Sequence, residues 1–119
     1  MDLPNYYEKT SAIYRYVLEL QEGKYYVGIS QNPEYRIYQH DYGYSTKFVR
    51  KYLPIFDYEM EVLETTDWDE AEFEETNKAI ELIAIYGVEN VCGGAILGNT
   101  KEREKIYKHE LDKREISIF

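Results

Sequence analysis

Residues 14–40, with the sequence YRYVLELQEGKYYVGISQNPEYRIYQH, decide the predicted fold of this chain. Aromatic and β-branched residues over 13–20 predict a strand, and a turn follows at 21–23. Residues 24–29 predict the returning strand. Pro33 then opens a helix, because proline is well suited to the first helical turn. The segment therefore predicts a β-hairpin that leads directly into a helix.

Polar side chains gather in this segment. Arg36 and His40 are four residues apart, so they share one face of the predicted helix. Tyr16 and Tyr26 lie on the two preceding strands. Two phenols, an arginine and a histidine are more polar chemistry than a hairpin needs for folding, and they indicate a functional site. Cross-strand packing of the tyrosines and a solvated helix face for the other two residues are the alternatives.

The rest of the chain predicts five further elements. They are a short basic helix over 46–53 that Pro54 ends, an alternating strand over 57–64, a long helix over 68–86 that Gly87 ends, a glycine-rich element over 90–94 and a charged helix over 101–114. Glu72 begins the apolar stripe of the long helix and is expected to face inward. A carboxylate in that position needs a partner, because an unpaired buried charge is costly.

The length of 119 residues predicts one compact domain with a single core. Cys92 is the only cysteine, which excludes an internal disulfide and a cysteine-based zinc site. The first residues are polar, and no apolar run approaches a membrane-spanning length. We therefore expect a soluble intracellular protein, either cytoplasmic or nuclear.

The formal net charge of −9 is opposite in sign to that of a typical nucleic-acid binder. The charge is nevertheless unevenly distributed, since residues 31–56 are locally basic and residues 61–81 are strongly acidic. The acidic stretch either complements a helix dipole or attracts a divalent cation. Lys47, Arg50 and Lys51 form a basic patch that could follow a phosphate backbone, and a solvated helix is an equal alternative.

In order and spacing, these residues resemble the GIY-YIG nuclease family. The Gly-Ile-Tyr motif falls on residues 14–16, where only its tyrosine is kept, as Tyr16. The Tyr-Ile-Gly motif falls on Tyr26-Val27-Gly28. The interval from Tyr26 to Arg36 and His40 is similar to the family's helix-borne arginine with a histidine one turn later.

The second half of the chain continues the resemblance, which covers roughly residues 13–94. Glu72 with Thr76, followed by residues 86–94, resembles a subgroup of small family members. Cys92 is a departure, because arginine is common at that position in the subgroup. The resemblance implies a nuclease-like domain over residues 1–98 and a charged C-terminal helical extension over 99–119.

The resemblance also implies an α/β (α+β) fold, in which a small three-stranded, mainly antiparallel sheet is flanked by helices. The implied activity is metal-dependent hydrolysis of DNA phosphodiester bonds with Mg²⁺ or Mn²⁺. The implied site residues are Tyr16 or Tyr26 for water activation, Arg36 for the phosphate, His40 for proton transfer or phosphate contact, Glu72 as the metal ligand and Asn90 in the site lining.

Several alternatives stay open at this point. Glu75 competes with Glu72 as the metal ligand, and the Thr76 spacing favours Glu72. Asn90 either lines the site or only caps the turn after the long helix. A nuclease-like fold that serves as a binding or interaction module is the alternative function. The expected partners are DNA and either a second copy of the chain or a DNA-targeting protein.

Overall fold

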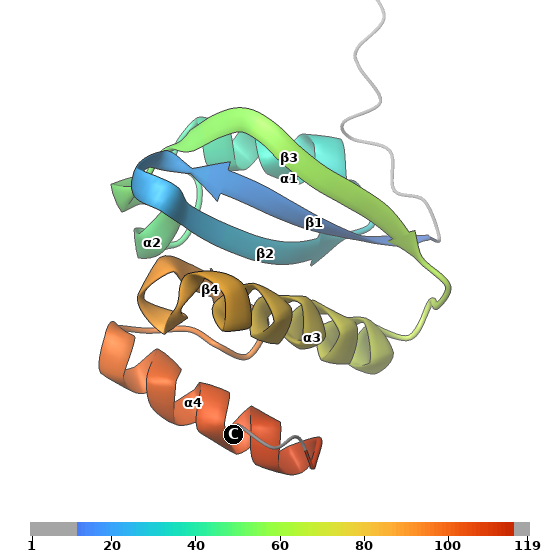
Figure 1. Ribbon diagram of the computed structural model, residues 1–119. Helices are drawn as coiled ribbons and strands as arrows, with labels where there is room; N and C mark the ends of the chain where they lie inside the picture. The colour runs from blue at the N-terminus through green and yellow to red at the C-terminus, as the bar shows by residue number, and fades with distance from the viewer. Residues whose placement is uncertain (1–11, 116–119) are drawn as a thin grey trace, which may run out of the picture.

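The computed structural model describes residues 12–115, apart from the side chains of residues 56–58. A four-stranded sheet with the order β3-β1-β2-β4 forms its centre (Figure 1). The strands are β1 (Ile13–Leu20), β2 (Lys24–Ser30), β3 (Pro54–Leu63) and β4 (Val91–Gly93), and the α-helices are α1 (Pro33–Asp41), α2 (Lys47–Lys51), α3 (Trp68–Tyr86) and α4 (Thr100–Lys113). The predicted α/β (α+β) class, in which helices flank the sheet, is confirmed.

The expected three-stranded sheet is too small. β1 pairs antiparallel with both β2 and β3, as a mainly antiparallel sheet requires. The additional strand is β4, which pairs parallel to β2 through only three residue pairs. A strand of three residues is too short to show alternation in the sequence, so the glycine-rich segment gave no strand signal.

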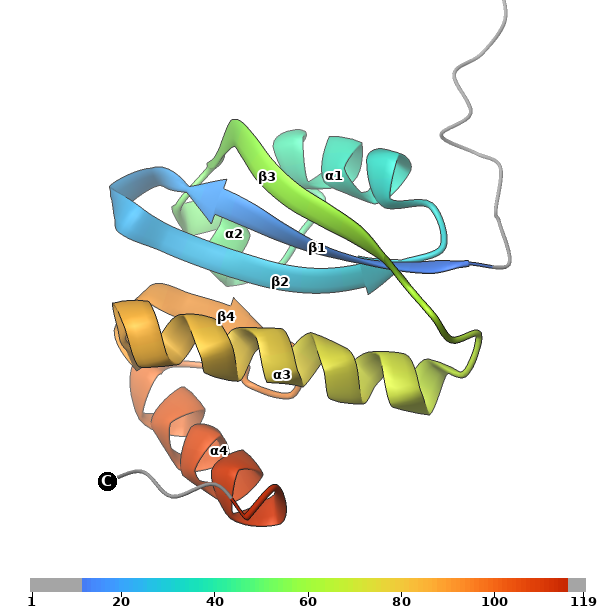
Figure 2. The same cartoon turned by 45° about the vertical axis from the view of Figure 1, so that its right-hand side comes forward.

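The two faces of the sheet are covered by different helices (Figures 1 and 2). On one face, Val17 and Val27 pack with Ala79 and Ile83 of α3. On the other face, a second cluster joins the sheet to α1 and α2. Its members are Tyr16, Leu18, Leu20, Tyr26, Ile37, Val49 and Cys92. Because successive strand residues point to opposite faces, β1 supplies both clusters.

The C-terminal helix α4 belongs to the same core as α3. Leu111 is buried in the cluster that contains Val17 and Ala79. Arg114, at the end of α4, donates a hydrogen bond of 2.6 Å from Nε to Oδ1 of Asn77 on α3. The division of the chain at residues 98 and 99 stays a prediction. None of the helices between residues 12 and 115 is long and apolar enough to cross a membrane.

Tyr16 and Gly28 are register partners on β1 and β2, and they pack closely against each other. A Cβ atom added to Gly28 would overlap Cζ and Oη of Tyr16. Gly28 has no left-handed backbone, so conformational freedom is not the reason for a glycine here. The position requires glycine because the tyrosine ring lies across it.

We predict that Gly28→Ala lowers the free energy of unfolding by about 1–3 kcal/mol, because the new methyl group overpacks this contact. Urea denaturation measures the loss. In a Tyr16→Ala background the same substitution should cost much less, since the ring that it meets is gone. An equal cost in both backgrounds would show that the ring is not what requires glycine.

Candidate active site

Tyr16, His40 and Ser45 form a buried hydrogen-bonded chain. The Tyr16 hydroxyl lies 2.9 Å from Nε2 of His40. On the other side of the ring, Nδ1 of His40 contacts the Ser45 hydroxyl. Burial, assisted by the nearby Arg36 charge, lowers the pKa of His40 to about 3. The imidazole is therefore neutral at physiological pH and has one donor and one acceptor nitrogen for its two partners.

The charge of Arg36 acts on Tyr16, Tyr26 and His40, and it favours a lower pKa at each of them. Its guanidinium donates hydrogen bonds to the backbone oxygen of Tyr44 (3.0 Å) and to Oε1 of Gln39 (3.2 Å). A further hydrogen bond from Arg36 reaches the Tyr16 hydroxyl and lowers the pKa of that phenol. Arg36 and His40 therefore share a helix face, as predicted, and that face is turned toward Tyr16.

Glu75 lies on α3, the helix on the opposite face of the sheet, and its charge acts on both Tyr16 and Tyr26. We call the whole group the tyrosine cluster; its members are Tyr16, Tyr26, Arg36, His40, Ser45 and Glu75. Glu75 reaches the outer edge of β2, on the side away from β1, at the point where the pairing with β4 has ended at Val27 and Gly93. Beyond that point Gly94 takes a φ of 57° and packs on Thr76. The next backbone N–H on this open edge, that of Ile29, bonds to the Glu75 carboxylate.

Burial is the largest cause of the perturbed pKa values at this edge. Burial first and then the neighbouring Glu72 charge raise the pKa of Glu75 to about 7, against the opposing effect of the Ile29 hydrogen bond. Burial and the Glu75 charge raise the pKa of Tyr26 to about 12. The pKa of Tyr16 lies far above its ordinary value, because of burial first and then of Tyr26 and Glu75. Both phenols are therefore protonated in the protein alone.

Glu72 does not face inward, so that part of the prediction is wrong. Its side chain is exposed, whereas Thr76, Ala79 and Ile83 of the same predicted stripe are buried. An exposed carboxylate in the second turn of a helix needs no buried partner. The role of Glu72 as a metal ligand is untested, and the residue lies close enough to raise the pKa of Glu75.

Asn90 is engaged away from the tyrosine cluster. Its Oδ1 accepts a hydrogen bond of 2.6 Å from Nζ of Lys24. Its Nδ2 donates to the backbone oxygen of Tyr86, 2.7 Å away, in the last turn of α3. These are the contacts of the capping alternative, and no described contact joins Asn90 to Tyr16, Tyr26 or His40.

Two members of the cluster were not in the predicted set. Ser45 lies in a loop without any motif, and the only signal for it is its short distance in sequence from His40. Glu75 was the rival of Glu72. The signal that could have selected it is its place directly before Thr76, a residue on the buried stripe of α3, which brings its side chain to the open edge of β2.

The donor set fits a hard divalent cation. Glu75 provides a half-buried carboxylate, and Glu72 adds a second negative charge beside it. Between residues 12 and 115, no three histidine, cysteine or acidic side chains gather where they could hold a metal. Magnesium does not require such a group, because it keeps several waters and binds through one or two carboxylates.

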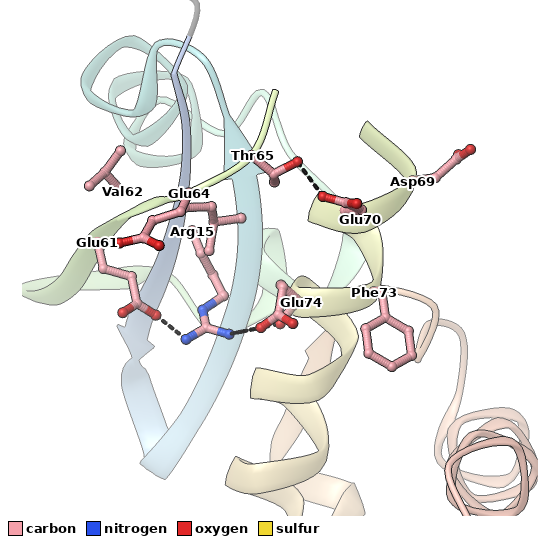
Figure 3. Close-up of a pocket in the computed structure, with 10 residues that line it drawn as sticks. Arg15, Glu61, Val62, Glu64, Thr65, Asp69, Glu70, Phe73 and Glu74 are labelled. Carbon is pink, nitrogen blue, oxygen red and sulfur yellow. Dashed lines mark hydrogen bonds and ion pairs between the residues drawn. The ribbon is translucent and has the colours of Figure 1, made fainter. Parts of the chain in front are cut away.

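A separate acidic pocket of about 690 Å³ lies on the other face of the sheet (Figure 3). Arg15 follows the alternation of β1, so it points away from the Tyr16 side. Its guanidinium pairs with Glu61 of β3 and with Glu74 of α3. None of the tyrosine cluster lines this pocket. The arginine that replaces the isoleucine of the first motif thus has its own ion pairs and does not enter the candidate site.

We predict that Glu75→Gln raises the free energy of unfolding at pH 8 by about 1–2 kcal/mol, discounted for the solvent contact of this side chain. The folded protein holds the Glu75 proton up to about pH 7, whereas an unfolded chain releases it near pH 4.5. The wild-type protein therefore loses stability as the pH rises between these values, and glutamine removes that loss.

Urea denaturation in EDTA at pH 4 and pH 8 measures this difference. At pH 4 the variant and the wild-type protein should be equally stable, because Glu75 is then protonated in both states. Glu72→Gln is the matched control on the same helix, and it should give a smaller gain at pH 8. A gain for Glu75→Gln that is the same at both pH values would contradict the raised pKa.

Comparison with known protein families identifies the family of this chain. The model of the GIY-YIG catalytic domain matches residues 12–82, which is more than half of the chain. That range contains Tyr16, Tyr26, Arg36, His40 and Glu75. No curated protein and no solved structure matches the chain. The chain belongs to the GIY-YIG family, whose catalytic domain is a nuclease-type DNA endonuclease domain.

Proposed function

We propose that this protein is a metal-dependent endonuclease that hydrolyses DNA phosphodiester bonds at the cluster of Tyr16, Arg36, His40 and Glu75. One observation carries the proposal. Side chains from β1, α1 and α3 meet at the open edge of β2, where a phenol, an imidazole, a guanidinium and a carboxylate lie together. A packed core has no need for this combination.

Arg36 is the proposed phosphate contact. A guanidinium matches the oxygens of a phosphodiester and neutralises the charge that develops on them. Arg36 is only partly buried and forms no ion pair with a described carboxylate, so its charge is available. A phosphate bound there would also offset the positive charge that depresses the pKa of His40.

Tyr16 and His40 are the proposed path for the proton of the attacking water. As the water attacks phosphorus, Tyr16 Oη takes its proton and passes the phenolic proton to Nε2 of His40, 2.9 Å away. Ser45 holds the other side of the imidazole and fixes its orientation. The phosphorus–oxygen bond to the leaving group breaks, and that oxygen takes a proton from solvent. Tyr26 packs edge-on against His40, with ring centroids 5.2 Å apart.

Glu75 is the proposed holder of the divalent cation, with Glu72 as a nearby second carboxylate. A bound Mg²⁺ or Mn²⁺ would supply positive charge that stabilises the phosphoryl oxygens and lowers the pKa of nearby acids. The raised pKa of Tyr16, Tyr26 and Glu75 makes that charge necessary for a tyrosine to act as a base at neutral pH.

Cleavage of supercoiled plasmid and of branched DNA tests both glutamates. With Mg²⁺ or Mn²⁺ we expect wild-type protein to cut, Glu75→Gln to lose about a hundredfold or more in rate, and Glu72→Gln to keep most of its activity. A larger loss of cleavage rate in Glu72→Gln than in Glu75→Gln would identify Glu72 as the metal ligand. Failure of folded wild-type protein to cut any DNA would favour the alternative function, a nuclease-like fold that acts as a binding module.

Tyr16→Phe tests the proton path without disturbing the packing on Gly28, since the ring remains. We expect a loss of about 10²–10³-fold in single-turnover cleavage rate. The melting temperature should fall by only a few degrees, because the lost hydroxyl leaves the buried Nε2 of His40 without this partner while the ring packing remains. Tyr26→Phe is the matched control and should lose less, because only Tyr16 has a hydroxyl bonded to His40. A larger loss for Tyr26→Phe would indicate that Tyr26 of β2, and not Tyr16, takes the proton of the attacking water.

A double-strand cut requires two such sites or two successive cuts. A second copy of the chain or a DNA-targeting partner protein would meet that need, and both belong to this proposal. Analytical ultracentrifugation with and without DNA separates them.

A further inference from the structure

Next to the tyrosine cluster lies a cavity of about 660 Å³ between α2, β4 and the start of α4, which we name the α2–α4 cavity. Its charged lining residues are Lys47 and Lys51 of α2, Arg103 and Glu102 of α4, and Glu89, and its other lining residues include Phe48, Tyr52 and Cys92. The two lysines lie on the α2 side, and the two glutamates lie on the side of α4 and of the segment before β4. We propose that this cavity holds the DNA strand beside the cleavage point, and that Lys47 and Lys51 bind its phosphates. This inference rests on the proposed nuclease function and places part of its substrate.

The α2–α4 cavity adjoins the candidate active site at two points. Cys92 lines the cavity and is the register partner of Tyr26, whose pKa it affects. Thr46 also lines it and directly follows Ser45, which contacts His40. A DNA strand with one phosphate at Arg36 would therefore have its adjacent nucleotides beside the α2–α4 cavity.

The cations of α2 differ in their pairing from several cations elsewhere in the described chain. On the far side of the sheet and on α4, Arg15, Lys78, Lys108 and Arg114 each pair with a glutamate. No carboxylate whose side chain the structure describes, in residues 12–55 and 59–115, lies within ion-pair distance of Lys47, Arg50 or Lys51. Three exposed like charges in one five-residue helix repel each other, and a bound polyanion would relieve that repulsion.

Aromatic rings and a buried arginine fix the shape of the cavity. Lys51 and Lys24 each place Nζ 5.1 Å from the centre of the Tyr52 ring, so a ring that lines the cavity holds the Lys51 ammonium group in position. Arg103 is buried and donates hydrogen bonds to the backbone oxygens of Val88, Glu89 and Gly98. These bonds hold the start of α4 against the segments on either side of β4. Phosphates are suitable ligands here, because ammonium groups bind them as point charges.

Arg50 gives an internal comparison. It lies on the same helix, is exposed and carries the same charge, yet it does not line the cavity. A general positive potential would make Arg50 as important as its neighbours, whereas a cavity that seats the strand would make Lys47 and Lys51 more important. Lys105, exposed on α4, is the control away from this helix.

Binding of fluorescein-labelled duplex and single-stranded DNA, measured by anisotropy in EDTA over a series of salt concentrations, tests the inference. We expect Lys47→Gln with Lys51→Gln to weaken binding on the order of tenfold at low salt. The slope of log affinity against log salt should fall by about 1 for each lysine. Lys47→Arg with Lys51→Arg should keep the affinity, and Arg50→Gln and Lys105→Gln should have much smaller effects.

Equal binding by the double glutamine variant and the wild-type protein would overturn the inference, and so would an equal loss in Arg50→Gln. Plasmid cleavage by wild-type protein with Mn²⁺ separates this failure from that of the proposed function. If the wild-type protein cuts DNA and the lysines do not matter, only the α2–α4 cavity is wrongly assigned. If it neither cuts nor binds DNA, the nuclease function fails and this inference fails with it.

Discussion

The ring of Tyr16 lies across Gly28, and the candidate site depends on that contact. The β1–β2 register makes the two residues partners, and the missing side chain of Gly28 leaves room for the ring to extend toward the outer edge of β2. The phenol then meets the imidazole of His40. A shift of one residue in the register would send Tyr16 to the opposite face of the sheet, and the cluster would be lost.

The short β4 strand is the second constraint. Had β4 continued along β2, its backbone would occupy the N–H of Ile29, and α3 could not bring Glu75 to the edge. The Gly93–Gly94 turn ends the pairing after Val27 and is anchored by Thr76, whose Oγ1 accepts a hydrogen bond from Ala95 at 3.0 Å. The glycine-rich segment therefore shapes the site without supplying a reactive group.

Charge in this protein is separated by face. The acids of β3 and the start of α3 lie with Arg15 on one side of the sheet, and the cations of α1 and α2 lie on the other. A net charge of −9 is thus compatible with a locally attractive surface for DNA. The net charge sums over both faces of the sheet, so the excess of acids on one face hides the basic surface on the other. For this reason the total charge alone argued against nucleic-acid binding.

Much of this could be predicted from local pattern. The hairpin, α1 and the α3 limits at Trp68 and Tyr86 follow from alternation, helix-start residues and a terminal glycine. Tyr16, Arg36 and His40 were placed together because motif spacing fixes residues on neighbouring elements. Glu72 and Glu75 could not be separated, since their difference depends on how α3 crosses the β2 edge. The β4 strand was missed because three residues carry no periodic signal.

The central claim is that Glu75, and not the acidic pocket, holds the metal beside Tyr16. A crystal of the protein soaked in Mn²⁺ and measured at a wavelength where manganese scatters anomalously tests it directly. The account predicts one strong anomalous peak at the Glu75 carboxylate, on the Tyr16 side of the open β2 edge. A peak among Glu61, Asp69 and Glu74 on the other face, with none at Glu75, would contradict it.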